Sequence, residues 1–166
     1  MHVDQRGRFV KTFHNKYFDE NNLNTDFNEQ YYSVSKQGVL RGMHFQVPPF
    51  AHSKLVYCVA GSILDVAVDL RKNSPTFLNH ISIELSADKA NMIYLPEGIA
   101  HGFFSLVDAV VMYNVSTTYR PEADSGVLWS SIGMDWPKPN PRVSERDKTF
   151  PKLKEFDSPF EFRSNQ

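Results

Sequence analysis

The stretch Ser62-Ile-Leu-Asp-Val-Ala-Val-Asp-Leu70 indicates which class of fold the chain adopts. Every second position is apolar, and the positions between include the carboxylates Asp65 and Asp69. This period of two is that of a β-strand, whose successive side chains point to opposite faces of a sheet. One face is therefore apolar. In a closed or two-sheet β fold the other face is either solvent-exposed or turned into a ligand cavity, and the alternation is compatible with both.

Similar short runs, rich in Val, Ile, Tyr and Phe, lie on both sides of this stretch between turn residues. We expect strands over residues 30–35, 54–59, 62–70, 80–85, 91–95 and 109–116. Their regular spacing predicts an all-β sandwich or barrel. We expect a single domain over residues 1–166, with a C-terminal extension from about residue 137 that wraps the β core with loops or short helices.

Composition excludes several classes of protein. The 166 residues suit one domain, and 41% hydrophobic with 22% charged residues is typical of a globular protein. A formal net charge of −1 without a long basic run argues against nucleic-acid binding. No apolar stretch reaches bilayer-spanning length, and the N-terminus has no signal-peptide core, so we expect no membrane partner. Cys58, the only cysteine, lies in an apolar run, which predicts a buried thiol and fits a reducing cytoplasm.

Two clusters punctuated by Gly and His resemble the halves of a cupin core: Gly42-Met-His44-Phe-Gln46 and Pro96-Glu-Gly98-Ile-Ala-His101. Metal-binding cupins have a second histidine and an acidic ligand in the first cluster. Here Phe45 follows His44, and Lys54 lies where the acidic ligand is expected. Two histidines beside a lysine are a poor site for a divalent cation. We therefore predict acid–base chemistry without a metal, which survives treatment with EDTA.

The residue types suit removal of a carbon-bound proton. An imidazole near neutrality is an effective base when a carboxylate orients it and a cation stabilises the enolate that forms. His44, Asp147 and Lys54 are candidates for these three roles, and Tyr113 is a candidate to return a proton from the opposite face. The same residues also suit structural roles, such as a core histidine, a helix cap or a sheet aromatic.

The ordered motifs resemble the dTDP-4-dehydrorhamnose 3,5-epimerase family over most of the chain. The motifs are Asp4-Gln-Arg6-Gly7, Gly38-Val-Leu-Arg41-Gly42-Met-His44-Phe-Gln46, Lys54-Leu-Val, Gly61-Ser-Ile-Leu-Asp65-Val-Ala-Val-Asp69-Leu-Arg71, Pro96-Glu-Gly-Ile-Ala-His101-Gly102-Phe103 and Ser144-Glu-Arg-Asp147. The resemblance implies a cupin jelly roll that forms a homodimer and uses no cofactor. It also implies epimerisation, at C3, C5 or both, of a 4-keto-6-deoxyhexose linked to a nucleoside diphosphate.

The resemblance also assigns the roles of single residues. It implies that His44 is the general base, held by Asp147, that Tyr113 is the general acid, and that Lys54 is the cation at the enolate. The implied substrate contacts are Arg6 and Arg41 to the diphosphate, His101 to the sugar, Tyr119 stacked on the nucleobase, and further contacts from Glu29 and Gln46. Guanidinium groups suit phosphate because they donate paired hydrogen bonds.

The chain departs from the family pattern around the nucleoside. Lys11 replaces a glutamate, and Glu29-Gln30-Tyr31 replaces a Gln-x-Asn element, so the nucleoside stays open between thymidine, the family default, and cytidine or another nucleoside. The chain begins at the Asp4-Gln-Arg6-Gly7 element, and we expect the strand before it to be missing or shortened. Two other functions stay open. One is a non-catalytic cupin that binds sugar nucleotides, and the other is a related 3,4-ketoisomerase.

Overall fold

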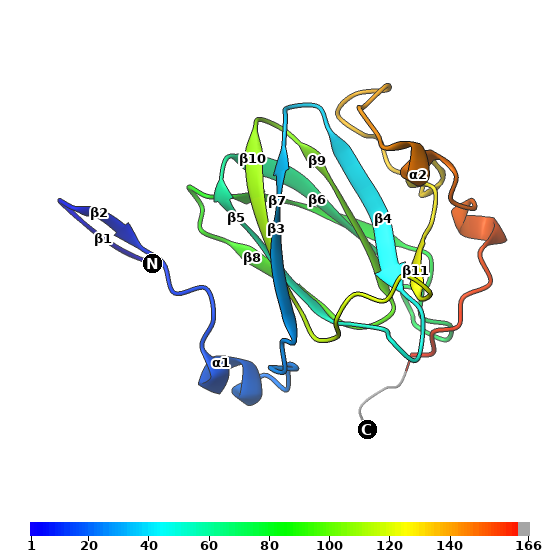
Figure 1. Ribbon diagram of the computed structural model, residues 1–166, viewed down its shortest axis with the longest axis horizontal. Helices are drawn as coiled ribbons and strands as arrows, with labels where there is room; N and C mark the ends of the chain where they lie inside the picture. The colour runs from blue at the N-terminus through cyan, green and yellow to red at the C-terminus, as the bar shows by residue number, and fades with distance from the viewer. Residues whose placement is uncertain (163–166) are drawn as a thin grey trace.

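The computed structural model describes residues 1–162 and contains two antiparallel sheets that face each other (Figure 1). One sheet has the strand order β3 (Glu29–Ser35), β10 (Ala109–Val115), β5 (Lys54–Ala60) and β8 (Met92–Leu95). The other has the order β11 (Asp124–Gly126), β4 (Leu40–Gln46), β9 (Ile99–Ser105), β6 (Ser62–Asp69) and β7 (His80–Ser86). The chain crosses repeatedly between the sheets, and the all-β jelly roll of the cupins is confirmed.

The six strands expected from the sequence lie within one residue of β3, β5, β6, β7, β8 and β10. Strands β4 and β9 were not among them, because each carries one of the glycine- and histidine-containing clusters and lacks a simple alternation. The structure explains the glycines. A Cβ on Gly102 would lie 2.6 Å from Met43 Sδ and 2.8 Å from the Arg41 carbonyl oxygen, so only glycine lets β9 approach β4 this closely.

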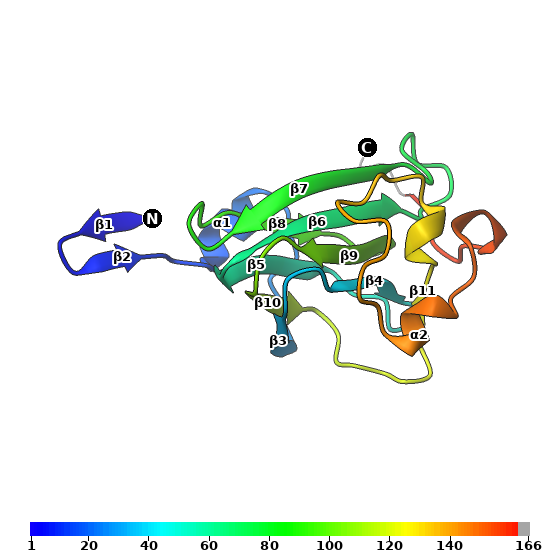
Figure 2. The same ribbon diagram turned by 90° about the horizontal axis from the view of Figure 1, so that it is seen from above.

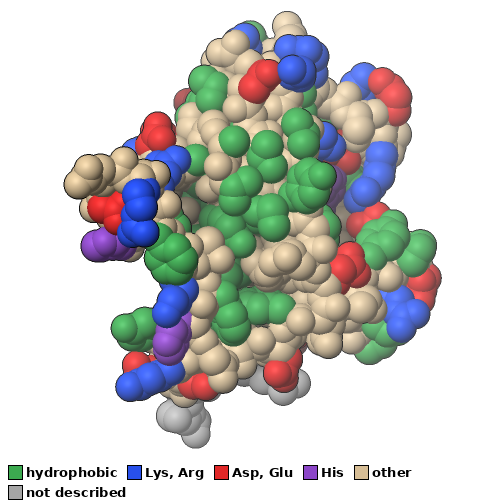
Figure 3. Space-filling view, turned by 60° about the vertical axis from the view of Figure 1, so that its left-hand side comes forward, with side chains coloured by type: hydrophobic (Ala, Val, Ile, Leu, Met, Phe, Trp, Pro, Cys, Tyr) green, Lys and Arg blue, Asp and Glu red, His purple; other side chains and the backbone are tan. Residues whose placement is uncertain are grey.

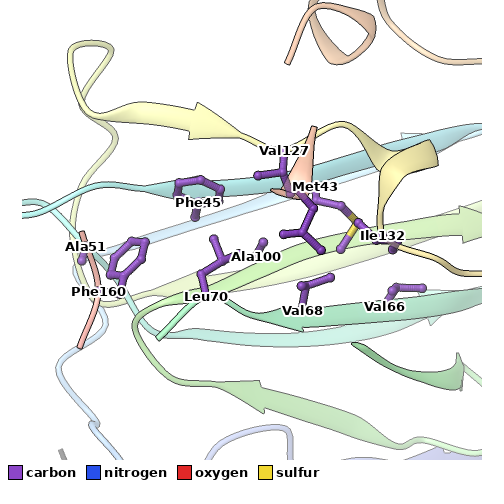
Figure 4. Close-up of a cluster of buried hydrophobic side chains, with 11 residues drawn as sticks. Met43, Phe45, Ala51, Val66, Val68, Leu70, Ala100, Val127, Ile132 and Phe160 are labelled. Atoms are coloured by element: carbon purple, nitrogen blue, oxygen red, sulfur yellow. The ribbon is translucent and has the colours of Figure 1, made fainter. Parts of the chain in front are cut away.

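The two faces of β6 are buried in different ways. Ile63 and Ala67 belong to the core between the sheets, with side chains such as Val56, Val111 and Phe103. Val66, Val68 and Leu70 lie on the outer face of the five-stranded sheet, together with Met43 and Phe45 of β4. Val127, Ile132, Leu153 and Phe160 pack against this face (Figure 4). The face that carries Asp65 therefore points to the interior, which settles the alternative that the sequence left open.

The C-terminal part of the chain provides the outer cover. It contains η1 (Trp129–Ser131), α2 (Glu145–Lys148) and η2 (Leu153–Glu155), in agreement with the expected short helices and loops. Phe156 and Phe160 both pack on Phe45, with ring centroids 5.1 and 5.8 Å from it. This part of the chain also brings α2 next to β4.

The N-terminal residues form a hairpin that projects away from both sheets (Figures 1 and 2). It consists of β1 (His2–Asp4) and β2 (Gly7–Phe9), and a linking segment leads from it to α1 (Asn15–Glu20). All six strand residues of the hairpin are exposed. Among residues 1–162, no helix has the length and apolar character needed to cross a membrane.

Candidate active site

A cavity of about 350 Å³ opens between the two sheets, at the end nearest α2 and the segment that follows β10. Its lining includes the expected residues Glu29, Arg41, His44, Gln46, Lys54, His101, Tyr113 and Tyr119. This volume lies in the range of small-molecule sites. Residues far apart in the sequence converge here because β3, β4, β5, β9 and β10 all border the cavity.

His44 and Asp147 form a hydrogen-bonded pair. His44 Nε2 lies 2.8 Å from Asp147 Oδ1, and the backbone N–H of Gly42 donates to Asp147 Oδ2 at 3.0 Å. Asp147 is only 3% exposed, and Ser144 caps the short helix that carries it. Since a carboxylate only accepts, the pair fixes the hydrogen of neutral His44 on Nε2 and leaves the Nδ1 lone pair as its basic position.

Burial sets the protonation of this pair. It lowers the pKa of His44 below its ordinary value, and this effect exceeds the opposing hydrogen bond and charge of Asp147. For Asp147, burial acts to raise the pKa, but hydrogen bonds from His44, Gly42 and Ser144 prevail and hold it below its ordinary value. A neutral imidazole beside an ionised carboxylate is the arrangement that a general base requires near neutral pH.

Lys54 is a buried cation on the cavity wall. Its Nζ donates to the backbone oxygen of His44 at 3.1 Å. Burial lowers the pKa of Lys54 to about 8, although the carboxylates of Asp65 and Asp124 act to raise it. The ammonium group therefore predominates at neutral pH, next to the histidine that would remove a proton.

A second histidine–aspartate pair lies beside the first. His101 Nε2 lies 2.7 Å from Asp65 Oδ2, and the side chains are 4% and 0% exposed. The register of β4 and β9 places His44 opposite His101, so both imidazoles reach the same cavity. Asp65 had been seen in the alternation of its strand but given no role, and the structure shows that it orients His101.

Tyr113 is buried and contacts three cavity side chains. Its hydroxyl lies 3.3 Å from Ser33 Oγ, its ring stacks on Tyr31 with centroids 4.7 Å apart, and its ring and the His101 ring form a T-shaped pair with centroids 6.1 Å apart. Burial raises the pKa of Tyr113 far above its ordinary value, so the phenol keeps its proton. A protonated tyrosine is the form that a general acid needs.

Polar residues line the outer part of the cavity. Arg41 donates to Ser35 Oγ at 2.9 Å and to the Val34 carbonyl oxygen at 3.2 Å. Gln46 accepts from the backbone N–H of Arg120 at 2.7 Å and donates to the Phe50 carbonyl oxygen at 2.8 Å. Gln46 thus holds the segment after β10 in place.

Tyr119 is held from two sides at the mouth of the cavity. Its backbone N–H donates to Glu29 Oε2 at 2.8 Å, and its hydroxyl donates to Asp124 Oδ2 at 3.3 Å. Arg146 Nη2 donates to the other oxygen of Asp124 at 2.9 Å. Glu29 therefore positions Tyr119, and the ring of Tyr119, 55% exposed, remains open to a ligand.

One expected residue is not brought to the cavity of this chain. Arg6 lies on the hairpin, where it pairs with Asp4 and its side chain is 87% exposed. The lining also contains residues outside the predicted site, among them Arg146, Tyr31 and His52. Arg146 directly precedes Asp147 in the Ser144-Glu-Arg-Asp147 motif, and Tyr31 belongs to the departure expected around the nucleoside, whereas nothing in the sequence marked His52 as a cavity residue. Burial, aided by Lys54 and His101, lowers the pKa of His52 to about 3 and keeps it neutral.

The fold and the cavity together define a cupin-type isomerase that works by proton transfer. A sequence model of dTDP-4-dehydrorhamnose 3,5-epimerase matches residues 1–155. The chain belongs to the dTDP-4-dehydrorhamnose 3,5-epimerase family, and the resemblance found in its motifs is confirmed.

Similar proteins support this family over nearly the whole chain. The dTDP-4-dehydrorhamnose 3,5-epimerase of Shigella flexneri is 43% identical over 148 residues, which cover 87% of this chain and 82% of that protein. The crystal structure of the Sulfolobus tokodaii enzyme of the same name has a TM-score of 0.90 and 34% identity, covering 96% and 89% of the two chains. A Legionella pneumophila dTDP-6-deoxy-D-glucose-3,5-epimerase in complex with dTDP-4-keto-L-rhamnose also has a TM-score of 0.90, with 33% identity and the same coverage. The activity of this chain is accordingly epimerisation, at C3, C5 or both, of a 4-keto-6-deoxyhexose linked to a nucleoside diphosphate.

Proposed function

We propose that epimerisation in this chain is carried by His44 and Tyr113, acting from opposite faces of the hexose. His44 removes a proton from a carbon next to the 4-keto group, and the electrons of that C–H bond form an enolate. Tyr113 then donates its phenolic proton to the other face of the same carbon, which inverts it. The observation that carries this proposal is the fixed His44–Asp147 pair in one cavity with a buried, protonated Tyr113.

Lys54 stabilises the enolate in this proposal. Its buried ammonium lies beside His44, and a fixed cation in a poorly solvated site stabilises negative charge more strongly than water does. His101, oriented by Asp65, supplies a second polar contact to the sugar. Proton exchange with solvent returns His44 and Tyr113 to their starting forms, and no step transfers a hydride or an electron, so the cycle requires no redox cofactor. The position of Lys54 also disfavours a divalent cation between the two histidines.

The nucleoside diphosphate lies at the outer end of the cavity in the same proposal. Arg41 and Arg146 line this end and can donate to phosphate oxygens, and the exposed ring of Tyr119 offers a stacking surface for the base. The Legionella pneumophila complex makes dTDP the first candidate nucleotide. Lys11 and Glu29, which depart from the family pattern, keep CDP as the alternative to test.

We also propose that the active form is a homodimer in the cytoplasm. Register pairs place Tyr32 beside Met112 and Val34 beside Val110 on the outer face of the four-stranded sheet. Tyr32, Val34 and Val59 are exposed there, and Figure 3 shows apolar side chains gathered on the face that carries this sheet. An apolar surface of this kind is typical of a protein interface. A second copy would cover it and give the projecting hairpin a place to dock.

Solvent-exchange experiments test the catalytic roles. The enzyme is incubated in deuterated buffer with dTDP- or CDP-linked 4-keto-6-deoxyglucose, and NMR shows which carbons acquire deuterium and which are inverted. We expect His44→Ala to lower exchange by about 100- to 10,000-fold while nucleotide binding persists. Tyr113→Phe should lose inverted product and keep some exchange, because His44 can return a proton to its own face.

Three outcomes would contradict this proposal. Near-normal turnover by His44→Ala would remove His44 as the base, and a constitutional isomer instead of an epimer would show a ketoisomerase. Binding of both nucleotides without any exchange would show a sugar-nucleotide-binding protein. Equal affinity for dTDP and CDP, unchanged by Glu29→Gln, would mean that the departures around the nucleoside have no effect on the base.

A further inference from the structure

Tyr31 lies on the strand next to the proposed general acid and is in direct contact with it. Strands β3 and β10 are antiparallel neighbours, and their register pairs Tyr31 with Tyr113. The two rings are nearly parallel, at 19° between their planes and 4.7 Å between centroids. Side chains directly opposite each other on one face of a sheet interact and stabilise the pairing of its strands. Tyr31 therefore limits the positions that the Tyr113 ring can take.

The contact lies inside the cavity and not on the outer surface. Tyr31, Ser33 and Tyr113 all line it, whereas Tyr32 between them points to the other face of the sheet and is 65% exposed. Ser33 holds only the hydroxyl of Tyr113, through a contact of 3.3 Å, and the His101 ring forms a T-shaped pair with the Tyr113 ring. Of these three contacts, Tyr31 alone stacks on the Tyr113 ring.

We propose that Tyr31 is a positioning residue that aims the Tyr113 hydroxyl at the carbon to be inverted. This inference rests on the proposed function of Tyr113. Epimerisation requires that the second proton arrive from the face opposite His44, and it fails whenever His44 returns its own proton first. A tyrosine free to tilt loses this competition, because proton transfer depends steeply on distance and alignment. The aromatic ring of Tyr31 is the part that matters, and its hydroxyl takes no part.

Tyr31 departs from the family pattern, and its contact with Tyr113 gives this departure a role in proton transfer and not in selection of the base. Tyr31 replaces the asparagine of a Gln-x-Asn element that we had placed around the nucleoside. In the structure Glu29, from the same element, holds Tyr119, while Tyr31 packs on Tyr113. The two substitutions thus act on different parts of the proposed site.

The test compares Tyr31→Ala with Tyr31→Phe in deuterated buffer, on the full-length protein and a dTDP-linked 4-keto-6-deoxyhexose. The measured quantity is the ratio of deuterium exchange with retention to inversion at the same carbon. We expect Tyr31→Ala to raise this ratio about tenfold or more, as expected for a catalytic group displaced by a fraction of an ångström. Tyr31→Phe keeps the stacked ring and should stay within about twofold of the unmodified enzyme. Tyr17→Ala, which removes an exposed tyrosine from α1, controls for general effects of losing a ring.

Each outcome decides one of two questions. A lower rate for Tyr31→Ala with an unchanged ratio would mean that Tyr31 only supports the fold, and would overturn the inference. A shift in Tyr31→Phe as large as in Tyr31→Ala would also overturn it, because the hydroxyl would then be the active part. If the unmodified protein neither exchanged nor inverted the substrate, the proposed function itself would fail. The unmodified protein therefore tests the proposed function, and the variants test the role of Tyr31.

Discussion

Asp147 decides which nitrogen of His44 is basic. The carboxylate accepts the Nε2 hydrogen at 2.8 Å, so the Nδ1 lone pair is the position left to take a proton from the substrate. As the proton arrives, the imidazole becomes a cation, and the buried carboxylate beside it stabilises that charge. Asp147 thus contributes both orientation and electrostatic stabilisation.

We therefore expect Asp147→Asn to lower the exchange rate by about 100- to 10,000-fold. The amide can keep a contact with the Gly42 N–H through its oxygen, but it carries no charge and its NH₂ group cannot accept the Nε2 hydrogen. Exchange kinetics by NMR and nucleotide titration check this. Asp157→Asn, at an exposed carboxylate paired with Lys72, is the control. Activity of Asp147→Asn equal to that of this control would contradict the role of the pair.

Activity should depend on pH through His44 and Lys54. His44 acts as a base only when neutral, and its pKa is lowered by burial, so the acidic limb of kcat/KM should lie at a lower pH than an ordinary histidine would give. Lys54 stabilises the enolate only when charged, and its pKa is about 8, so kcat/KM should fall as pH rises through that value. Tyr113 does not cause this fall, because its pKa is raised far beyond it.

A pH–rate profile with Lys54→Arg tests the alkaline limb. Arginine keeps its charge throughout the accessible range, so the fall near pH 8 should disappear even if the rate is lower. An alkaline limb at the same pH in Lys54→Arg would assign this limb to another group. The absence of such a limb in the unmodified enzyme would contradict the role of Lys54 as the charged stabiliser.

At the scale of elements, β6 shows why much of the fold could be predicted from the sequence. Its alternation is complete because one face packs under the C-terminal part of the chain and the other faces the interior. Strands β4 and β9 were not predicted from the sequence. They carry His44 and His101, and Gly102 is required by the close approach of the strands, so functional and packing demands replaced the apolar pattern.

The outer cover of β6 should make a large contribution to stability. Phe160 is 5% exposed and packs against Phe45, so Phe160→Ala should lower the free energy of unfolding by about 3–5 kcal/mol. Phe162, two residues on, places its ring against the Arg71 guanidinium, and Phe162→Ala should cost about 1 kcal/mol or less. Chemical denaturation checks both. Equal losses would show that the tail is not anchored mainly by Phe160.

At the scale of the whole molecule, the sequence predicted residue types better than their relations in space. His44, Lys54 and Tyr113 line one cavity as expected, and Asp147 is hydrogen-bonded to His44. His52 was missed because its approach depends on how the loop before β5 folds back, which no local pattern encodes. Arg146 was missed although it lies next to Asp147 in a recognised motif. Arg6 presents the opposite case, since its motif was recognised but the hairpin carries it away from this chain's own cavity.

The position of Arg6 leads to a prediction about the assembly. If Arg6 binds the diphosphate, the projecting hairpin must deliver it to the cavity of a second copy, and each active site then combines residues of two subunits.

Arg6→Ala and His44→Ala should each be poorly active alone, at substrate concentrations near KM. Mixed after co-expression or reversible unfolding, they should form heterodimers in which one site has both its own His44 and the partner's Arg6. Random pairing of equal amounts restores about one quarter of the sites, because half of the dimers are mixed and each contains one intact site. The specific activity of the mixture, measured against each variant and against unmodified protein carried through the same procedure, is the test. Normal activity of Arg6→Ala would remove Arg6 from the site, and no recovery in a mixture shown to contain heterodimers would mean that Arg6 does not act across the interface.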